Sequence, residues 1–252
     1  MARVIAIMNE QTQVGKTVTT LNLGYALALM NKKVTLIDLD PKAQLSRDCE
    51  LAEVEYGIHQ VLQGEQTIEQ TQQHLADGFE VVSVGKNLMD YEQTGEGKTK
   101  LQLSYKLKQA IDAMTQQQDF VLIDCPSKPG LLAANALLAA DEIIVPTKPN
   151  FLSLQGLVRI VKLFKRLKKI SGGAKLWLIL TQMDPTDKLS SEVKEMLITY
   201  FPQRLFSTMI RQDEAVTESQ SHKKAIFDYH QESEGATDYF SLAQDLIEGR
   251  VS

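Results

Sequence analysis

The chain has 252 residues and carries 27 Lys and Arg against 32 Asp and Glu, a formal net charge of −5. This acidic balance argues against a protein that coats nucleic acid by bulk charge, although it leaves room for a local basic patch. With 43% hydrophobic and 23% charged residues, the composition is typical of a globular protein and excludes a collagen-like or low-complexity chain.

The cysteines are Cys49 and Cys125, too few for a disulfide framework or a four-thiolate zinc site, which predicts a reducing compartment. The first ten residues show no cleavage-site pattern, and no stretch approaches the roughly 18 apolar residues of a membrane-spanning helix. We therefore expect a cytoplasmic protein. Because α/β folds often run to about 250 residues undivided, we expect residues 1–252 to form one domain.

Two periodicities alternate along the chain. Short apolar runs rich in β-branched residues predict strands at Val4–Met8, Val34–Asp38, Phe79–Val84, Phe120–Asp124, Glu142–Pro146 and Lys175–Thr181, with a weaker candidate at Leu205–Ile210. A repeat of about 3.6 residues predicts helices at Thr17–Met30, Leu101–Gln117, Leu131–Ala139, Leu154–Lys169, Ser190–Tyr200 and Ala236–Glu248. This alternation is typical of βαβ units and predicts an α/β fold, a mostly parallel twisted sheet with helices on both faces.

Two segments lack a clear period. Lys86–Lys100 is polar and glycine-containing and predicts a loop, and the glutamine-rich piece Gln60–Gln73 predicts a solvated helix with its turns.

A candidate phosphate site follows the first strand, in the run N-E-Q-T-Q-V-G-K-T that begins at Asn9. A phosphate needs backbone N–H groups at a helix N-terminus, a lysine for the β and γ oxygens, and a hydroxyl on Mg²⁺. Gly15, Lys16 and Thr17 supply all three. The strict pattern G-x-x-x-x-G-K-[ST] fails, since its first glycine falls on Glu10, so a plain loop beside a helix cap is the alternative.

A second G-K-T occurs at Gly97–Thr99 without a strand before it, and we take it as a chance occurrence. Acidic residues distinguish the first site. Asp38 and Asp40 end one strand in D-L-D-P, and Asp124 ends another in D-C-P. Ligands of such sheets bind at the carboxyl ends of the strands, where one carboxylate can hold Mg²⁺ and another can orient water. The alternative is that these residues only form turns.

These motifs, in this order, resemble the ParA/MinD family of deviant Walker ATPases. The resemblance rests on G-K-T near residue 16, D-L-D-P at 38–41, I-D-C-P at 123–126, A-D-E-I-I-V-P at 140–146 and the tail around Ser221–Lys224. It covers nearly the whole chain and is closest to the ParA branch. It implies a P-loop ATPase that forms a homodimer around two ATP molecules, binds DNA non-specifically as the dimer, and is released when a small adaptor protein stimulates its weak hydrolysis.

Carried over residue by residue, the resemblance implies that Lys16 binds the β and γ phosphates, Thr17 binds Mg²⁺, and Asp40 positions the attacking water. Asp38 and Asp124 then complete the magnesium shell. The implied ATP loop comprises Gln11, Thr12, Gln13, Val14, Gly15, Lys16, Thr17 and Val18.

The loop departs from the family pattern K-G-G-x-G-K-T, whose first lysine reaches the partner's phosphates. That position is Gln11 here. A lysine about 4 Å away could contribute on the order of 4 kcal/mol at an effective dielectric near 20, which glutamine cannot replace. Either ATP is not hydrolysed in the usual way, or another cation substitutes. Lys148 is the favoured substitute, because the resemblance places its loop near the dimer face, and Lys128 is the other candidate.

Without this lysine, the chain also resembles the McdA branch of carboxysome-positioning ATPases, which use the nucleoid as a matrix. Plasmid or chromosome partition is the second candidate function. We therefore expect a cytoplasmic, nucleoid-associated protein that positions or segregates a cargo.

Two basic groups are candidate DNA contacts. The stretch from Val158 to Ile170 contains six basic residues and no acid. Four of them share a helical face at spacings of three and four, namely Arg159, Lys162, Arg166 and Lys169. The second group, Arg211, Lys223 and Lys224, matches the region where ParA proteins contact DNA. A plain solvated face and a membrane surface are the alternatives for the helix.

A membrane-binding tail of the MinD type is disfavoured, because Asp238–Ser252 holds three acids against Arg250 alone. Two other functions stay open. One is a metabolic or redox P-loop relative, in which Cys49 and Cys125 would bridge an iron–sulfur cluster between subunits. The other is a nucleotide-binding pseudoenzyme, consistent with Gln11.

Overall fold

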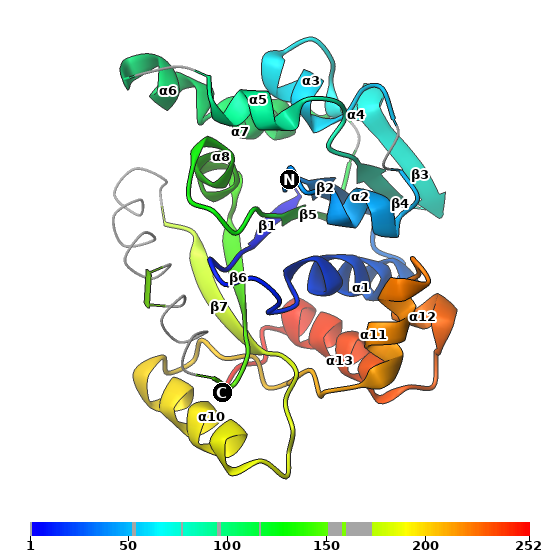
Figure 1. The fold of residues 1–252 in the computed structure, drawn as a ribbon, viewed down its shortest axis with the longest axis vertical. Coiled ribbons are helices and arrows are strands. Elements are labelled where there is room, and N and C mark those ends of the chain that lie inside the picture. The colour runs from blue at the N-terminus through cyan, green and yellow to red at the C-terminus, as the bar shows by residue number, and fades with distance from the viewer. Residues whose placement is uncertain are drawn as a thin grey trace.

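The computed structural model describes residues 2–51, 54–76, 78–94, 97–115, 117–150, 158–159 and 173–252. Within them lies a seven-stranded sheet of order β3-β4-β2-β5-β1-β6-β7 (Figure 1). Its strands are β1 (Arg3–Ile7), β2 (Val34–Asp38), β3 (Gln72–Ala76), β4 (Phe79–Val82), β5 (Phe120–Asp124), β6 (Glu142–Thr147) and β7 (Lys175–Leu180). Every neighbouring pair is parallel except β3 with β4. The predicted α/β fold with a mostly parallel sheet is confirmed.

The central strands are nearly continuous apolar runs, because both of their faces are covered by helices. Their register sets the site. Asp38, the last residue of β2, is aligned with Asp124, the last residue of β5, and Asp124 is aligned in turn with Ile7 of β1. The strands β2, β5 and β1 therefore end side by side, next to the loop that follows β1.

Helices cover both faces of the sheet (Figure 1). One layer contains α1 (Lys16–Leu29), α11 (Glu214–Ser221), α12 (Ile226–Tyr229) and α13 (Glu234–Glu248). The other contains α3 (Ile58–Gln63), α5 (Leu88–Glu92), α7 (Lys106–Asp112) and α8 (Leu131–Ala139). The described helices α2 (Gln44–Asp48), α4 (Ile68–Thr71), α6 (Gly97–Leu103) and α10 (Lys188–Tyr200) lie at the ends and edges.

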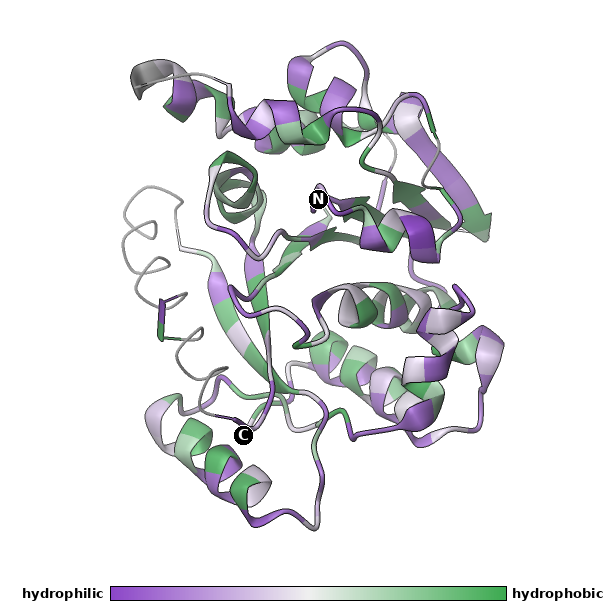
Figure 2. Cartoon of the chain, viewed as in Figure 1, coloured by the Kyte–Doolittle hydropathy of each residue, from purple (hydrophilic) through white to green (hydrophobic). Residues whose placement is uncertain are grey.

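Each face of the sheet has its own apolar core. Leu23 and Leu27 of α1 pack with Tyr239 of α13 on one face, and Leu107 of α7 packs with Leu132 of α8 on the other. Helix α8 is apolar apart from Asn135 (Figure 2), as its position between the sheet and the outer helices requires. No described helix is long and apolar enough to cross a membrane.

Several predicted elements are wrong in detail. Gln60–Gln73 ends in the edge strand β3 rather than in helix and turns, because Gln72 and Gln73 pair antiparallel with β4. Lys86–Lys100 is not a plain loop: it contains α5 and the start of α6. Leu205–Ile210 is not a strand of the ladder, since Leu205 and Phe206 make only isolated bridges. The predicted helix Leu154–Lys169 falls outside the described residues apart from positions 158 and 159.

The prediction of a single helix over Leu101–Gln117 is also wrong. The segment forms two helices, α6 and α7, and between them the Ser104 hydroxyl donates to Leu101 O at 2.6 Å. The buried N–H of Leu107 donates to Asn135 Oδ1 of α8 at 3.0 Å instead of joining a helical ladder. A tertiary hydrogen bond thus replaces the local one, which periodicity alone does not reveal.

Candidate functional site

The loop between β1 and α1, residues 8–15, is called the phosphate loop below. It ends in Gly15, which has a left-handed backbone (φ 85°) and precedes α1 without offering that helix a side-chain cap. No side chain caps the N–H groups at the start of this 14-residue helix. These N–H groups can therefore donate to a bound anion. Gln13 is also left-handed (φ 59°) although it has a side chain, a conformation that costs about 1 kcal/mol or more.

Side chains of the loop itself and of the segment that follows β7 hold this loop in place. Asn9 Oδ1 accepts from Gln11 N at 3.0 Å. At the end of β7, Thr181 Oγ1 donates to Val14 O at 2.9 Å and Gln182 Nε2 donates to Gln13 O at 3.2 Å. No sequence pattern pointed to Thr181 and Gln182, because their role depends on the sheet order that brings the end of β7 close to the phosphate loop.

Lys16 is buried at the start of α1, and its Nζ donates to two neutral oxygens. These are Gln11 O at 3.0 Å and Ser127 Oγ at 2.7 Å. Burial lowers the pKa of Lys16, and the fields of Asp124 and Asp40 oppose that shift. Among the described residues Lys16 makes no direct ion pair, so its ammonium group is available to an anion held by the phosphate loop.

Two buried carboxylates lie beside Lys16. Asp124 Oδ2 accepts from Thr17 Oγ1 at 2.7 Å. Asp38 accepts from the N and Oγ of Ser46 at 2.8 and 2.7 Å, and from Asp40 N at 3.2 Å. Burial raises the pKa of Asp38 to about 6, and burial together with the charge of Asp38 raises the pKa of Asp124. Such a pair is stabilised by a cation.

This donor set suits Mg²⁺ bound with phosphates. No group of three or more His, Cys, Asp or Glu among the described residues could hold a metal by itself. Mg²⁺ at a phosphate site needs only one or two protein oxygens, because phosphate oxygens and water fill its remaining positions. The Thr17 hydroxyl and the Asp124 carboxylate, whose oxygens lie 2.7 Å apart, could provide such oxygens, and the Asp38 carboxylate at the end of the adjacent strand is a further candidate.

Asp40 occupies a different environment from Asp38, two residues earlier. It is half-buried, and its Oδ1 accepts only from the backbone N of Lys42, at 3.0 Å, among the described residues. Its charge acts on both Lys16 and Asp124, so it lies at the rim of the site. A partly solvated carboxylate in this position can orient a water molecule.

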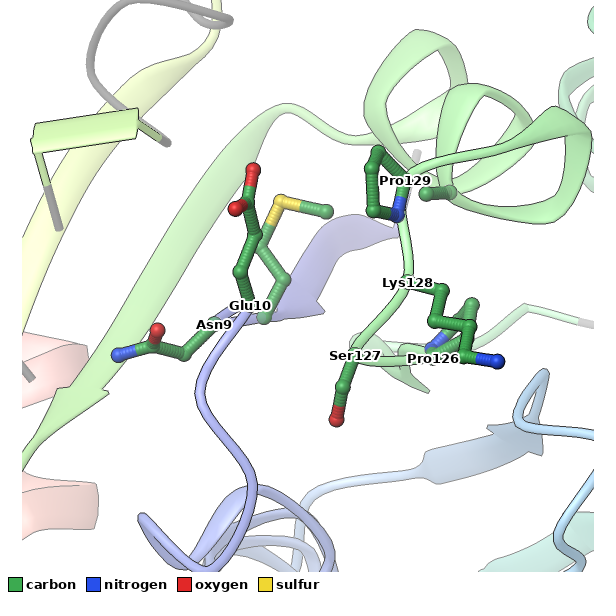
Figure 3. A pocket seen from close by; sticks show the side chains of 8 residues that line it. Asn9, Glu10, Pro126, Ser127, Lys128 and Pro129 are labelled. Carbon is green, nitrogen blue, oxygen red and sulfur yellow. The ribbon is translucent and has the colours of Figure 1, made fainter. Parts of the chain in front are cut away.

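A small pocket separates the phosphate loop from the loop that follows β5 (Figure 3). Its lining residues are Met8, Asn9, Glu10, Pro126, Ser127, Lys128, Pro129 and Ala133. Ser127 points toward the phosphate loop, whereas Lys128 extends away from it (Figure 3). Sequence reasoning missed Ser127, and only its place directly after the D-C-P motif could have suggested it.

The two candidate substitutes for the missing lysine both lie on loops at the carboxyl ends of the strands. Lys148 directly follows β6 and is half-buried, and burial lowers its pKa. Lys128 is exposed on the loop after β5.

The predicted DNA contacts divide into four groups. Arg159 is exposed but lies 3.4 Å from Glu10 Oε2 of the phosphate loop, which the sequence did not suggest. Arg211 donates bidentately to Asp238 and also pairs with Glu234 at 2.6 Å, so two acids of α13 already neutralise its guanidinium. Lys223 and Lys224 are exposed just after α11. The remaining three lie outside the described residues: Lys162, Arg166 and Lys169.

A family model described as an AAA domain matches residues 2–174. Among curated proteins, the sporulation initiation inhibitor protein Soj of Bacillus subtilis is 30% identical over 98% of each chain. The chromosome partitioning protein ParA of Caulobacter vibrioides is 30% identical over 97% of this chain and 94% of its own.

Solved structures extend this likeness. The septum site-determining protein MinD of Pyrococcus horikoshii, complexed with Mg-ADP, is 25% identical over 98% of this chain and 96% of its own, with a TM-score of 0.76. Two further likenesses show the fold alone. Cobyrinic acid a,c-diamide synthase of Mycobacterium smegmatis, bound to an ATP analog and magnesium, is 24% identical (98% and 95% covered, TM-score 0.83). Apo McdA of Cyanothece is 18% identical (98% and 100% covered, TM-score 0.84).

The family match, the full-length identity to Soj and ParA, and the sheet with its phosphate loop agree. The chain belongs to the ParA/MinD family of P-loop ATPases.

Proposed function

We propose that this chain is an ATP-driven positioning switch of the ParA type. ATP and Mg²⁺ bind at the phosphate loop, the loaded protein forms a homodimer with ATP at the interface, and the dimer holds DNA non-specifically at the nucleoid. An adaptor protein stimulates hydrolysis and so releases it. The observation that supports this most is the buried Lys16, whose Nζ has only neutral acceptors among the described residues, at 2.7 and 3.0 Å, beside two buried carboxylates.

Each residue has a distinct task toward the nucleotide. The N–H groups at the start of α1 and the Lys16 ammonium would hold the phosphates, and Thr17 with Asp38 and Asp124 would hold Mg²⁺. Mg²⁺ would neutralise charge on the phosphates as the terminal phosphoryl group leaves. Asp40 would hold the attacking water through Oδ2, the oxygen that does not accept from Lys42 N. Residues 11–18 would form the cradle.

The dimer part of the proposal needs a cation at the interface, because Gln11 carries none. We assign this role to Lys148. It is half-buried on the loop after β6, at the same sheet edge as the phosphate loop, and a partner's phosphates would restore the charged state that burial disfavours. Lys128 is the alternative.

The cargo follows from relatives only by analogy. Soj and ParA, the curated relatives at 30% identity, are a sporulation initiation inhibitor and a chromosome partitioning protein. McdA shares the fold at 18% identity. Chromosome or plasmid segregation is therefore our first choice and carboxysome positioning the second. A centromere-binding gene beside this one would support the first, and adjacent carboxysome shell genes would support the second.

The redox alternative has little support in the geometry. Cys125 is fully buried in the core, and burial raises the pKa of its thiol. Burial likewise raises the pKa of the Cys49 thiol to about 12. A cluster shared between subunits needs exposed, easily ionised thiols.

The function is tested with three proteins: wild type, Lys16→Ala and Asp40→Ala. Wild type should bind ATP with Mg²⁺ and stay on arbitrary DNA only when ATP is present. Lys16→Ala should lose nucleotide binding, and Asp40→Ala should bind nucleotide but hydrolyse it at least tenfold more slowly. Lys188→Ala is the control, because Lys188 is exposed on α10 and pairs with Glu192 of the same helix. Wild type that binds no ATP would disprove the proposal, and a lack of turnover with DNA and adaptor present would favour the pseudoenzyme.

A further inference from the structure

Ser127 lies on the loop between β5 and α8 and contacts the phosphate-binding lysine directly. Lys16 Nζ donates to Ser127 Oγ at 2.7 Å. In this contact the serine oxygen is the acceptor, so its own O–H proton is free to be donated. Among the described residues no acceptor for that proton is found. The site therefore holds a hydrogen-bond donor beside Lys16 that has no acceptor in the described part of the chain.

The loop that carries Ser127 is fixed at both ends. At the β5 end, the buried Cys125 donates its N–H to Ile7 O at 3.2 Å. At the α8 end, the Glu92 carboxylate accepts from Leu131 N at 2.6 Å and from Leu132 N at 2.9 Å. Pro126 and Pro129, on either side of Ser127, further restrict the backbone. Ser127 is thus held beside Lys16 rather than free to swing away.

An anion that Lys16 binds must come into the immediate surroundings of Nζ. In a phosphate loop of this kind the lysine reaches the β and γ phosphates. A hydroxyl that already contacts Nζ then lies next to the outermost oxygens of the bound group. A donor beside an anionic oxygen forms a charge-assisted hydrogen bond, which is stronger than a neutral one.

We propose that Ser127 is a specificity-determining residue that distinguishes a nucleoside triphosphate from a diphosphate. With a triphosphate, Ser127 donates to the terminal phosphate. A diphosphate has no such terminal phosphate. Ser127 Oγ then continues to accept from Lys16 Nζ and competes with the β phosphate for that donor. This inference rests on the proposed nucleotide binding, and it assigns to Ser127 a role that the sequence motifs did not suggest.

The test compares two ligands on two proteins. ADP and the non-hydrolysable analogue AMPPNP are titrated with Mg²⁺ into wild type and Ser127→Ala, and both Kd values are measured by calorimetry. In Ser127→Ala the competing acceptor on Lys16 is gone, so ADP should bind more tightly. AMPPNP should gain less, because it also loses its own hydrogen bond with the hydroxyl. The ratio of the ADP Kd to the AMPPNP Kd should fall about tenfold.

Ser127→Thr keeps the hydroxyl and should keep the wild-type ratio. Ser127→Cys, nearly isosteric with a weaker donor, should lower the ratio and serves if the alanine variant is unstable. Ser241→Ala is the matched control, since its hydroxyl on α13 donates to Thr237 O of the same helix, and it should leave both affinities unchanged. A ratio that stays within twofold of wild type in both Ser127→Ala and Ser127→Cys would overturn the inference. Wild type that binds neither nucleotide would instead disprove the proposed function.

Discussion

The carboxylate of Glu92 occupies the space that a β-carbon on Gly130 would need, because Glu92 Oε1 lies 1.7 Å from that position. Gly130 has an extended backbone (φ −178°) that any residue can adopt, so the glycine is required for space and not for conformation. The carboxylate occupies this space because it caps α8, accepting from Leu131 N and Leu132 N. This interaction joins α5 to the loop that carries Ser127.

Gly130→Ala should therefore destabilise the protein by displacing this cap. Losing a charged acceptor from two helix N–H groups costs about 1–3 kcal/mol, which in a chain of this size lowers the Tm by about 2–4 °C per kcal/mol. Thermal unfolding followed by circular dichroism measures it. Glu92→Ala should cost a similar amount.

The double variant Gly130→Ala/Glu92→Ala separates this account from a general strain effect. Both substitutions remove the same cap, so the double variant should be little worse than either single one. Fully additive losses of Tm would show that Gly130 is needed for some other reason.

The central strands could be predicted from the sequence because buried parallel strands are continuous apolar runs. β2 and β5 have the predicted bounds, Val34–Asp38 and Phe120–Asp124. The acids at their ends were also predicted to meet at one sheet edge, as the register of Asp38 with Asp124 confirms. In these segments the local pattern and the tertiary environment agree.

The parts that could not be predicted depend on contacts between distant segments. The break between α6 and α7 follows from the bond of Leu107 N to Asn135, and the capping role of Glu92 follows from α8. Ser127 contacts Lys16 across 111 residues. The charge and sequence position of Arg211 made it a candidate DNA contact, but its ion pair with Asp238 is visible only in the folded chain.

A second prediction concerns pH. Asp38 and Asp124 are adjacent buried acids whose folded pKa values are raised, to about 6 for Asp38. A raised folded pKa means that the stability it gives is present below the unfolded pKa, near 3.8, and is lost as pH rises through about 6. Without Mg²⁺ the wild-type protein should thus lose stability from about pH 4 to pH 7.

Asp124→Asn should relieve that loss, since it removes one of the two charges and keeps an acceptor for Thr17. At pH 8 and without Mg²⁺ its Tm should exceed that of wild type by several degrees. The rise in the pKa of Asp38 alone, about two pK units, corresponds to about 3 kcal/mol. The difference should vanish near pH 4. Asp112→Asn, at an exposed acid paired with Lys108, is the control, and parallel pH curves for wild type and Asp124→Asn would contradict the prediction.

A third prediction concerns the missing lysine of the phosphate loop. Lys148→Ala should abolish dimerisation with AMPPNP, measured by light scattering, while the nucleotide Kd stays within about threefold of wild type. Lys128→Ala should still dimerise, because Lys128 is exposed and extends away from the phosphate loop (Figure 3). Normal dimers of Lys148→Ala would exclude Lys148, and loss of dimers in Lys128→Ala alone would transfer the role to Lys128.

The last prediction separates the basic residues near the C-terminus. Lys223 and Lys224 are exposed, whereas Arg211 is bound by Asp238, which is only 7% exposed. Lys223→Gln/Lys224→Gln should keep the Tm and weaken ATP-dependent DNA binding. If both lysines neutralise phosphates, the salt dependence of binding should also become shallower, by about 0.9 in log–log slope for each phosphate that is no longer neutralised.

Arg211→Ala should behave in the opposite way, because it leaves a buried carboxylate without its cation. Its Tm should fall by several degrees at pH 7. The charge-matched control for the lysine pair is Lys175→Gln/Lys188→Gln, at two exposed lysines on β7 and α10, which should leave the salt slope unchanged. An Arg211→Ala protein with wild-type Tm and no DNA binding would show that Arg211 contacts DNA despite its ion pairs. An equal loss of salt slope in both lysine pairs would show that Lys223 and Lys224 act only through the net charge of the protein and not as specific DNA contacts.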